Sequence, residues 1–489
     1  MITPGSDTPD LVIRNGLVGS AAGSVVADVA IAGETIVAVG RGLPPGRAEI
    51  DATGKIVVPG GIDSHTHIEQ VSAGGLMNAD TWESATRAAA FGGTTSVIAF
   101  AAQHVGLDLA EVVADYEALA ARGAVIDHAF HMIVADPTEA ALAQLPALIE
   151  KGHSSIKAFM TYDRIRLSDE QLLDVMAVAK DKGAMVCVHA ENHGIISWTV
   201  KRLLAAGHTA PKHHALSHPR LSETEAFERL IRFSLLLDQP VMIFHVSTAE
   251  GAAVIRRWRG EGAKVFAETC PQYLFLTAAD LDRPGLEGAK WMCSPPPRAE
   301  ADQEALWRAL ALGDLQTVSS DHAPYRFDET GKLAHGPQST FKQMANGLPG
   351  LEARLPLLFD AMISHGRADL DAFVALTATN PARIYNLPNK GALLPGYDAD
   401  VAIWDPAAQV TFSDETVRDG TGYTPYAGRT VRGWPTTVIR RGAVIVEGGR
   451  MRAEAGSGRL MLRAGGPAAR GTGRREPELD PARGGAALI

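Results

Sequence analysis

The chain has 489 residues, of which 46% are hydrophobic and 21% are charged, and its 46 Lys+Arg against 56 Asp+Glu give a formal net charge of −10. This composition excludes an intrinsically disordered, collagen-like or coiled-coil protein. The negative charge, without a Lys/Arg stripe, argues against nucleic acid or a membrane surface as a partner. The length favours one large and one small core.

The sequence predicts a cytoplasmic protein. No apolar run approaches the roughly 18 residues of a membrane helix, and the opening MITPGSDTPD lacks the basic start and apolar core of a signal peptide. Cys187, Cys270 and Cys293 lie far apart and form no CxxC pair. They fit a reducing compartment, where thiols pack as small apolar groups. A catalytic thiol is the minority interpretation, because no neighbouring residue would obviously lower its pKa.

Both ends of the chain have the pattern of β-hairpins. Residues 1–57 alternate apolar and polar residues between glycines (DLVIRNG, DVAIAG, TIVAVG, KIVVPG), and residues 389–455 repeat the pattern in DADVAIWDP, TTVIRRG and AVIVEGG. We expect the two parts to form one small β-sandwich domain. Residues 456–489, rich in Gly, Ala, Arg and Pro, are expected to be a flexible tail or an oligomerisation arm.

Residues 58–388 alternate short β-rich runs with helical patterns such as EVVADYEALAARG and DEQLLDVMAVAKDKG. Repeated units of this kind imply a parallel sheet. About eight of them fit a closed (β/α)8 barrel better than an open sheet, and no GxGxxG turn indicates a dinucleotide site. The predicted strands are TTSVIAF, HAFHMIV, SSIKAFM, AMVCVHA, VMIFHVS, KVFAETC and TVSSDHAP, after a first strand KIVVPGGID. The predicted fold class is α/β, a barrel inserted between the halves of the small domain.

Barrel enzymes place their active sites at the C-terminal ends of the strands, so polar residues there are the candidate site residues. The first strand ends in His65-Thr66-His67. On an extended chain the i, i+2 spacing points both imidazoles to one face, where they can share a metal ion. A chance pair at the surface is the alternative, since the chain has 16 histidines. The position directly after an apolar strand favours the metal site.

Lys157 stands in the apolar run SSIKAFM, where a buried, unpaired ammonium group is costly. A lysine that reaches solvent or pairs with a carboxylate is the simpler interpretation. The alternative is an amine that reacts with CO2 to form a carbamate, which resembles a carboxylate and can bridge two divalent metal ions. Burial would favour the deprotonated amine that this reaction needs.

Two further histidines and one aspartate occupy equivalent positions. His189 closes the run AMVCVHA and His245 follows VMIF, while Asp321 follows TVSS. Singly, the histidines could be core residues bonded to the backbone, and Asp321 could be a turn or cap residue. Together with the HTH segment they indicate a metal site, in which Asp321 supplies the carboxylate that accepts a proton from water.

With these residues in order, the sequence resembles the amidohydrolase superfamily, and within it the cyclic amidohydrolases of the hydantoinase/dihydropyrimidinase branch. The resemblance covers nearly the whole chain. It is carried by VVPGGIDSHTH, RAAAFGGTTS, SSIKAFMTY, HAEN, FHVST, AETCPQYL, CSPPPR, SSDHAP, ANGLPGLE and NPARIYNLPNKGALLPGYDADVAIWDP.

The resemblance implies two divalent metal ions, with zinc as the expected metal, and a CO2-derived carbamate on Lys157 that bridges them. It assigns one ion to His65 and His67, the second to His189 and His245, and makes Asp321 a ligand and the general base. Tyr162 is implied to donate to the developing oxyanion, although an ordinary half-buried tyrosine is the alternative. Ser294 and Asn346 are implied to bind the amide edge of the substrate through main-chain groups. His322 is expected behind the ligands, orienting one of them or bonded to the backbone.

The expected reaction is hydrolysis of a 5-substituted hydantoin or dihydropyrimidine ring to an N-carbamoyl amino acid. Allantoinase and cyclic-imide hydrolase activities are alternatives. Dihydroorotase is less favoured because Ile68-Glu69-Gln70 supplies no arginine after the HTH segment. A single-metal deaminase and a non-catalytic scaffold are disfavoured because the lysine and every other ligand are present. A homodimer or homotetramer is expected.

Overall fold

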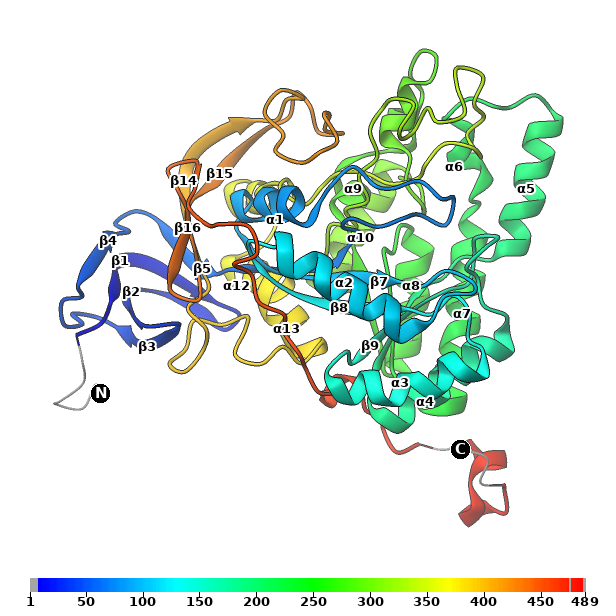
Figure 1. Cartoon of the computed structure of the whole chain (residues 1–489), viewed down its shortest axis with the longest axis horizontal. Coiled ribbons are helices and arrows are strands. Elements are labelled where there is room, and N and C mark those ends of the chain that lie inside the picture. The colour runs from blue at the N-terminus through cyan, green and yellow to red at the C-terminus, as the bar shows by residue number, and fades with distance from the viewer. Residues whose placement is uncertain (1–7, 475, 487–489) are drawn as a thin grey trace.

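The computed structural model describes residues 8–474 and 476–486, and its centre is a barrel of eight parallel strands (Figure 1). Between the first and last strands, Thr66 and His322 form a parallel bridge, and His67 N donates to His322 O at 2.7 Å. The predicted (β/α)8 barrel is therefore confirmed. Its strands are β6 (Gly61–Thr66), β7 (Thr94–Ala102), β8 (Asp127–Ile133), β9 (Ser155–Phe159), β10 (Met185–His189), β11 (Val241–Ile243), β12 (Val265–Thr269) and β13 (Thr317–Val318).

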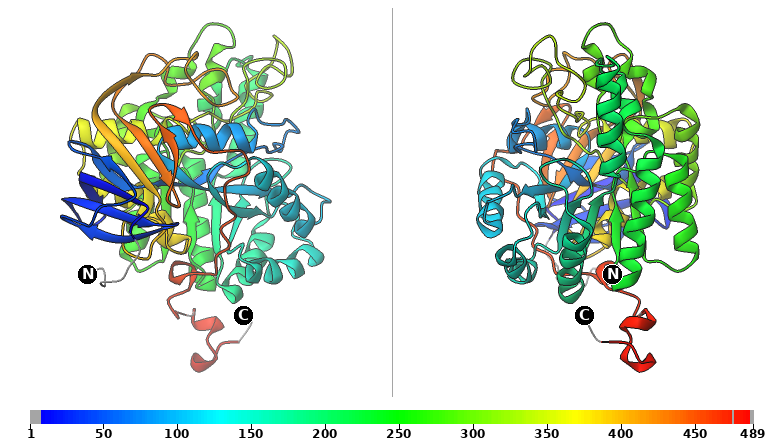
Figure 2. Two further views of the ribbon diagram at one scale, coloured as in Figure 1. Left: turned by 60° about the vertical axis from the view of Figure 1, so that its left-hand side comes forward. Right: turned by 90° about the vertical axis from the view of Figure 1, so that its right-hand side faces the viewer.

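Helices cover the outside of the barrel (Figure 2). The α4 helix illustrates how the sequence sets them: Ser168 caps its first turn, Gly183 ends it in a left-handed conformation, and an apolar stripe that includes Leu172 and Val175 is buried against the strands. The helices are α1 (Trp82–Phe91), α2 (Leu109–Gly123), α3 (Glu139–Lys151), α4 (Asp169–Lys182), α5 (His193–Ala205), α6 (His213–Ser217), α7 (Arg220–Leu237), α8 (Ala249–Gly260), α9 (Pro271–Phe275), α10 (Glu300–Ala311), α11 (Arg354–Phe359), α12 (Leu370–Val374) and α13 (Asn380–Ile384). None of the described helices is long and apolar enough to cross a membrane.

The two ends of the chain meet, as the sequence predicts, and the expected β-sandwich takes the form of one nine-stranded mixed sheet (Figure 1). β5 joins the two halves, since it pairs in parallel with β1 and antiparallel with β14. Residues from both halves, such as Ile36 and Ile439, share one apolar core. The strands are β1 (Leu11–Ser20), β2 (Gly23–Ala32), β3 (Thr35–Gly40), β4 (Ala48–Asp51), β5 (Ile56–Pro59), β14 (Val401–Thr411), β15 (Thr430–Arg440), β16 (Ala443–Glu447) and β17 (Arg450–Met451).

The run KIVVPGGID, expected as one barrel strand, is divided between the two sheets. Gly60 N donates to Asp400 O on the small-sheet side at 2.9 Å, and Gly61 N donates to Gly93 O in the barrel at 2.9 Å. A Cβ on Gly60 would lie 2.2 Å from Thr95 Oγ1, so only glycine fits at this crossing. Both segments are buried, and the sequence pattern therefore gives no sign of the division.

The segment after residue 456, expected as a flexible tail or an oligomerisation arm, packs at first against the barrel of its own chain. Met461 N donates to His128 O at 2.7 Å and Arg463 N to Gly152 O at 3.0 Å. The Arg463 side chain is buried and donates to Ser155 Oγ at 2.5 Å and Phe130 O at 3.2 Å. Figure 2 shows this segment running down the barrel to its lower end. The interpretation as a flexible tail is therefore wrong for this stretch.

Candidate metal centre at the mouth of the barrel

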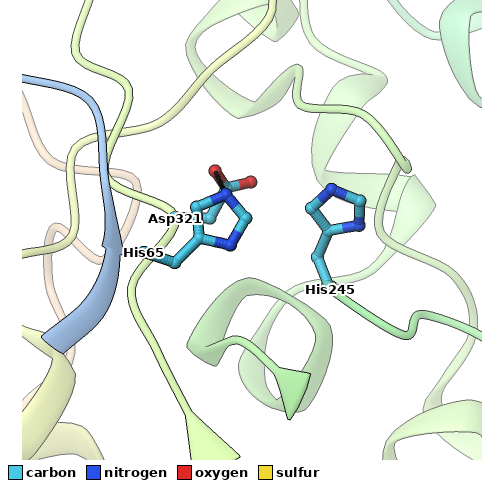
Figure 3. A group of neighbouring side chains, drawn as sticks. All are labelled: His65, His245 and Asp321. Carbon is cyan, nitrogen blue, oxygen red and sulfur yellow. Dashed lines mark ion pairs between the residues drawn. The ribbon is translucent and has the colours of Figure 1, made fainter. Parts of the chain in front are cut away.

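Three side chains from separate strand ends meet at one point (Figure 3). His65 is the second-last residue of β6, His245 follows β11, and Asp321 follows β13. Their ligand atoms all lie within 4.8 Å of one another, and His65 Nε2 is 3.1 Å from Asp321 Oδ1. All three are buried. His245 Nδ1 has no hydrogen-bond partner among the described residues. A buried, unsatisfied nitrogen beside a carboxylate fits a site that holds a divalent metal ion.

The remaining predicted ligands surround this group. His67 Nε2 is 3.4 Å from Asp321 Oδ1. The His189 ring lies 4.4 Å from the His245 ring, and the His245 ring lies 5.5 Å from the His65 ring, between centroids. The structure thus brings all four predicted histidines around one aspartate.

Three residues of the site have positive φ angles, namely Tyr162 at 76°, His245 at 43° and Asp321 at 49°. Side chains other than glycine seldom adopt this left-handed conformation, and residues held there cluster at functional sites. Each of the three residues stands two or three positions after the end of a barrel strand.

Acceptors behind three of the histidines fix which ring nitrogen faces the centre. His65 Nδ1 contacts Glu268 of β12, His67 Nδ1 lies 2.8 Å from Gln70 Oε1, and His189 Nε2 lies 2.8 Å from Glu191 Oε2. Each contact leaves the other ring nitrogen free to bind a metal ion. Sequence reasoning missed all three partners. Glu268 could have been found, because a carboxylate inside the apolar run KVFAETC is as unusual as Lys157.

The surroundings of the histidines and of Asp321 hold most of these side chains in the protonation state in which they can bind a metal ion. Burial lowers the pKa values of His67, His189 and His245, so their imidazoles are neutral. Burial alone would raise the pKa of Asp321, but His65 and His67 outweigh it, and this pKa falls well below its usual value. His65 differs: burial would lower its pKa, but Asp321 and Glu268 raise it.

Lys157 lies on β9 among aromatic rings. Its Nζ is 4.1 Å from the centroid of Phe244 and 4.7 Å from that of Phe159. The side chain is 1% exposed, and burial lowers the pKa of its amine to about 8. The lysine does not reach solvent, which removes one form of the simpler interpretation drawn from the sequence.

The three predicted substrate-binding residues have different surroundings. The Tyr162 ring lies 5.0 Å from the His189 ring, and burial raises the pKa of its phenol well above the usual value, so it remains a neutral donor. Ser294 Oγ lies 3.2 Å from His214 Nε2. Asn346 Oδ1 is buried with no hydrogen-bond partner in the described part of the chain.

Lys332, which sequence reasoning missed, connects the segments that carry Ser294 and Asn346. Its Nζ donates to the carbonyl oxygens of Ala345 and Gly347 at 2.9 Å each, and to that of Met292 at 3.4 Å. Its partners are backbone atoms, and nothing in the sequence around TGKLAHG marks them.

His322 supports the backbone and not a ligand's imidazole ring. Its Nε2 lies 2.9 Å from Asp80 Oδ2, its Nδ1 accepts from Gly350 N at 3.1 Å, and its carbonyl accepts from His67 N at 2.7 Å. Of the two expectations for this residue, the backbone-bonded one describes the contacts.

A parallel barrel with histidines, a buried lysine and an aspartate converging at its strand ends defines the class of barrel hydrolases that use metal ions. The Amidohydrolase family model matches residues 56–445. The chain belongs to this family, and the family implies the use of a divalent metal ion.

Known proteins similar to the chain extend over most of its length. It is 39% identical to the D-hydantoinase of Ralstonia pickettii, over 93% of this chain and 99% of that protein. It is 41% identical to the D-hydantoinase of Streptomyces coelicolor, over 89% and 94%. The solved dihydropyrimidinase from Brevibacillus agri NCHU1002 superposes with a TM-score of 0.90 at 40% identity, over 93% of this chain and 99% of that one.

Proposed function

We propose that this protein hydrolyses the ring of a 5-substituted hydantoin or a dihydropyrimidine to give an N-carbamoyl amino acid. The observation that carries the proposal is the complete donor set at the barrel mouth, four histidines and an aspartate beside a buried lysine. Similarity to D-hydantoinases and to a dihydropyrimidinase along nearly the whole chain supports the choice of substrate.

The donor set is suited to two metal ions, which we expect to be zinc. His65 and His67 would hold one, His189 and His245 the other, and Asp321 would contribute its carboxylate. Lys157 would bridge them as a carbamate, formed when its neutral amine bonds to CO2 and one proton is released. When bound, the ions supply a Lewis acid and a water that deprotonates near neutral pH.

The remaining chemistry belongs to side chains and backbone groups of the chain. The carboxylate of Asp321 accepts the proton of the attacking water and returns it to the ring nitrogen that leaves. Tyr162, a neutral phenol, donates to the oxygen that gains negative charge as the carbonyl is attacked. Backbone groups at Ser294 and Asn346 hold the amide edge of the ring and orient it toward Asp321.

We further propose that the enzyme acts in the cytoplasm as a homodimer or homotetramer. The three cysteines are free and buried, which agrees with a reducing compartment. Large apolar side chains, including Trp198 on α5 and Leu221 on α7, are exposed on the monomer, as expected of surfaces that pack against another subunit. Light scattering after size-exclusion chromatography measures the assembly directly.

Ring opening should be measured with protein supplied with zinc and bicarbonate, on hydantoin, 5-substituted hydantoins, dihydrouracil, a cyclic imide, allantoin and dihydroorotate. Lys157→Ala should lose turnover, whereas Lys201→Ala, which changes an exposed lysine of α5, should keep it. Preference for allantoin or the imide would select one of the alternative activities. Silence on the whole panel with two metal ions bound would refute the substrate assignment.

A further inference from the structure

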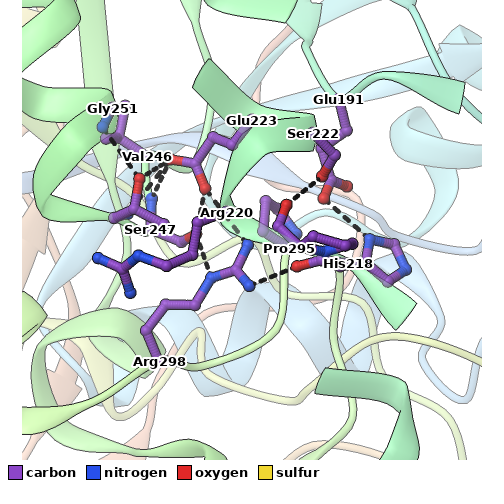
Figure 4. A network of polar contacts seen from close by, with 12 residues as sticks. Glu191, His218, Arg220, Ser222, Glu223, Val246, Ser247, Gly251, Pro295 and Arg298 are labelled. Carbon is purple, nitrogen blue, oxygen red and sulfur yellow. Dashed lines mark hydrogen bonds and ion pairs between the residues drawn. The ribbon is translucent and has the colours of Figure 1, made fainter. Parts of the chain in front are cut away.

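Figure 4 shows a network of polar contacts, one member of which, Glu191, lies 2.8 Å from His189 Nε2. Its buried charged members are Glu191, Glu223 and Arg298, of which both glutamates are 0% exposed and Arg298 is 9% exposed. Burying three charges is costly unless each is paired and hydrogen-bonded. The network therefore requires an explanation beyond general stability.

One branch of the network supports His189. Glu191 accepts from His189 through Oε2 at 2.8 Å and contacts His218 Nδ1 through Oε1 at 2.8 Å. Arg298 Nη1 donates to the backbone oxygen of His218 at 2.6 Å. Arg298 therefore fixes His218, His218 contacts Glu191, and Glu191 in turn orients His189.

The other branch supports the turn that follows His245. Glu223 Oε1 accepts from Ser247 N at 3.0 Å and Thr248 N at 3.2 Å, and its Oε2 accepts from the Ser247 hydroxyl. These bonds fix the backbone two residues beyond His245, whose own φ is positive. Arg298 Nε donates to Ser247 Oγ at 3.0 Å, and its Nη2 lies 3.5 Å from Glu223 Oε2.

Arg298 thus contacts both branches, and it ends the segment CSPPPR that begins one residue before Ser294. Without the guanidinium, Glu223 would lose the positive charge that opposes the effect of its burial. The His218 carbonyl and the Ser247 hydroxyl would each lose a donor. Both histidines would then be free to shift, while Glu268 and Gln70 would still hold His65 and His67.

We propose that Arg298 is a positioning residue for the metal ion assigned to His189 and His245, because it supports both histidines. The inference rests on the binuclear site of the proposed function. It predicts that loss of Arg298 weakens one of two metal sites and spares the other. Changes to groups behind a metal ligand typically weaken metal binding about 10–100-fold.

Metal binding tests the proposal without reliance on turnover. Chelator-treated wild type, Arg298→Met and Arg298→Lys are titrated with Zn²⁺ in the presence of bicarbonate, by calorimetry and by metal analysis after gel filtration. Wild type should bind two ions per chain. Arg298→Met should bind one ion as wild type does and the other at least tenfold more weakly. Arg298→Lys, which keeps the charge but not the three-way contact, should weaken the same ion by a smaller factor.

Two controls identify the site affected. Arg220→Gln removes a neighbouring arginine that pairs with Glu250 and Asp302, and it should retain both ions. The double variant of His67→Ala with Arg298→Met should hold no tightly bound ion, because the two changes affect different metal sites. If both changes affected the same site, the ion at the other site would remain tightly bound. Circular dichroism checks that each variant is folded. If Arg298→Met is unfolded, the zinc titration of Arg298→Lys tests the proposal instead.

The two failures are distinguishable. Wild-type protein that binds fewer than two ions in bicarbonate contradicts the proposed function itself. Wild type with two ions, together with folded Arg298 variants that bind both as tightly, overturns the role of Arg298 alone.

Discussion

Replacing Lys332 with methionine tests how the fold holds the segments that carry Ser294 and Asn346. The ammonium group is buried against the carbonyl oxygens of Met292, Ala345 and Gly347. Burial lowers the pKa of this amine to about 7, from an ordinary value of 10.5. Methionine keeps most of the apolar bulk of the side chain but removes the charge and the donor.

The size of the effect on stability follows from the pKa. Between about pH 7 and pH 10.5 the unfolded chain keeps the Lys332 proton, whereas the folded protein has lost it. The unfolded state binds more protons in this window, so the free energy of unfolding rises with pH. At about 1.4 kcal/mol for each unit of pKa, this group makes the wild type about 2 kcal/mol more stable at pH 9 than at pH 7. The methionine variant lacks this contribution.

Urea denaturation of wild type, Lys332→Met and the exposed control Lys201→Met at pH 7, 8 and 9 measures the free energies of unfolding. From pH 7 to pH 9 the difference between wild type and Lys332→Met should move by about 2 kcal/mol in favour of wild type. The control should follow wild type at every pH. A difference between wild type and Lys332→Met that is the same at pH 7 and pH 9 refutes the reasoning. In turnover assays KM should rise more than kcat falls, because the segments that carry Ser294 and Asn346, which we propose bind the substrate, lose this support.

Three further substitutions test the site and the fold. Tyr162→Phe removes the oxyanion donor and should lower kcat about 10²–10³-fold with little change in KM; an unchanged kcat in steady-state assays contradicts that role. Asp321→Asn cannot accept the proton of water and should lower kcat about 10²–10⁴-fold at saturating zinc; an unchanged kcat would mean that another group accepts this proton. Arg463→Met removes a buried charge that donates to Ser155 and Phe130, and should lower the free energy of unfolding by about 2–3 kcal/mol; an unaltered denaturation midpoint would mean that the tail segment does not support the barrel.

The sequence allowed the barrel to be predicted because short β-rich apolar runs alternate with helical patterns about eight times. His65, Lys157, His189 and His245 could be found because imidazoles and an amine are conspicuous beside valine, isoleucine and phenylalanine. Asp321 was less conspicuous, since aspartate is common in turns. Its role was inferred from the set and not from its own surroundings.

The residues that sequence reasoning missed act through contacts between distant parts of the chain. Lys332 bonds to backbone carbonyls, which every sequence contains, and the partners of Arg298 lie about 50 to 80 residues earlier in the chain, so no local pattern marks either residue. Arg463 lies in a stretch of glycine, alanine and arginine that resembles a disordered tail, yet its partners on β8 and β9 lie about 300 residues earlier. The division of KIVVPGGID at Gly60 was hidden because both sheets bury their strands.

The position of β5 has a consequence for the order of synthesis. This strand emerges from the ribosome early, but its partner β14 follows only after the whole barrel, roughly 340 residues later. At about 5–20 residues per second, β5 waits some 20–70 s with one edge unpaired. An open edge of valine and isoleucine is a template for pairing with other chains. Chaperone supply and translation speed should therefore govern the yield of soluble protein more than the stability of the finished fold.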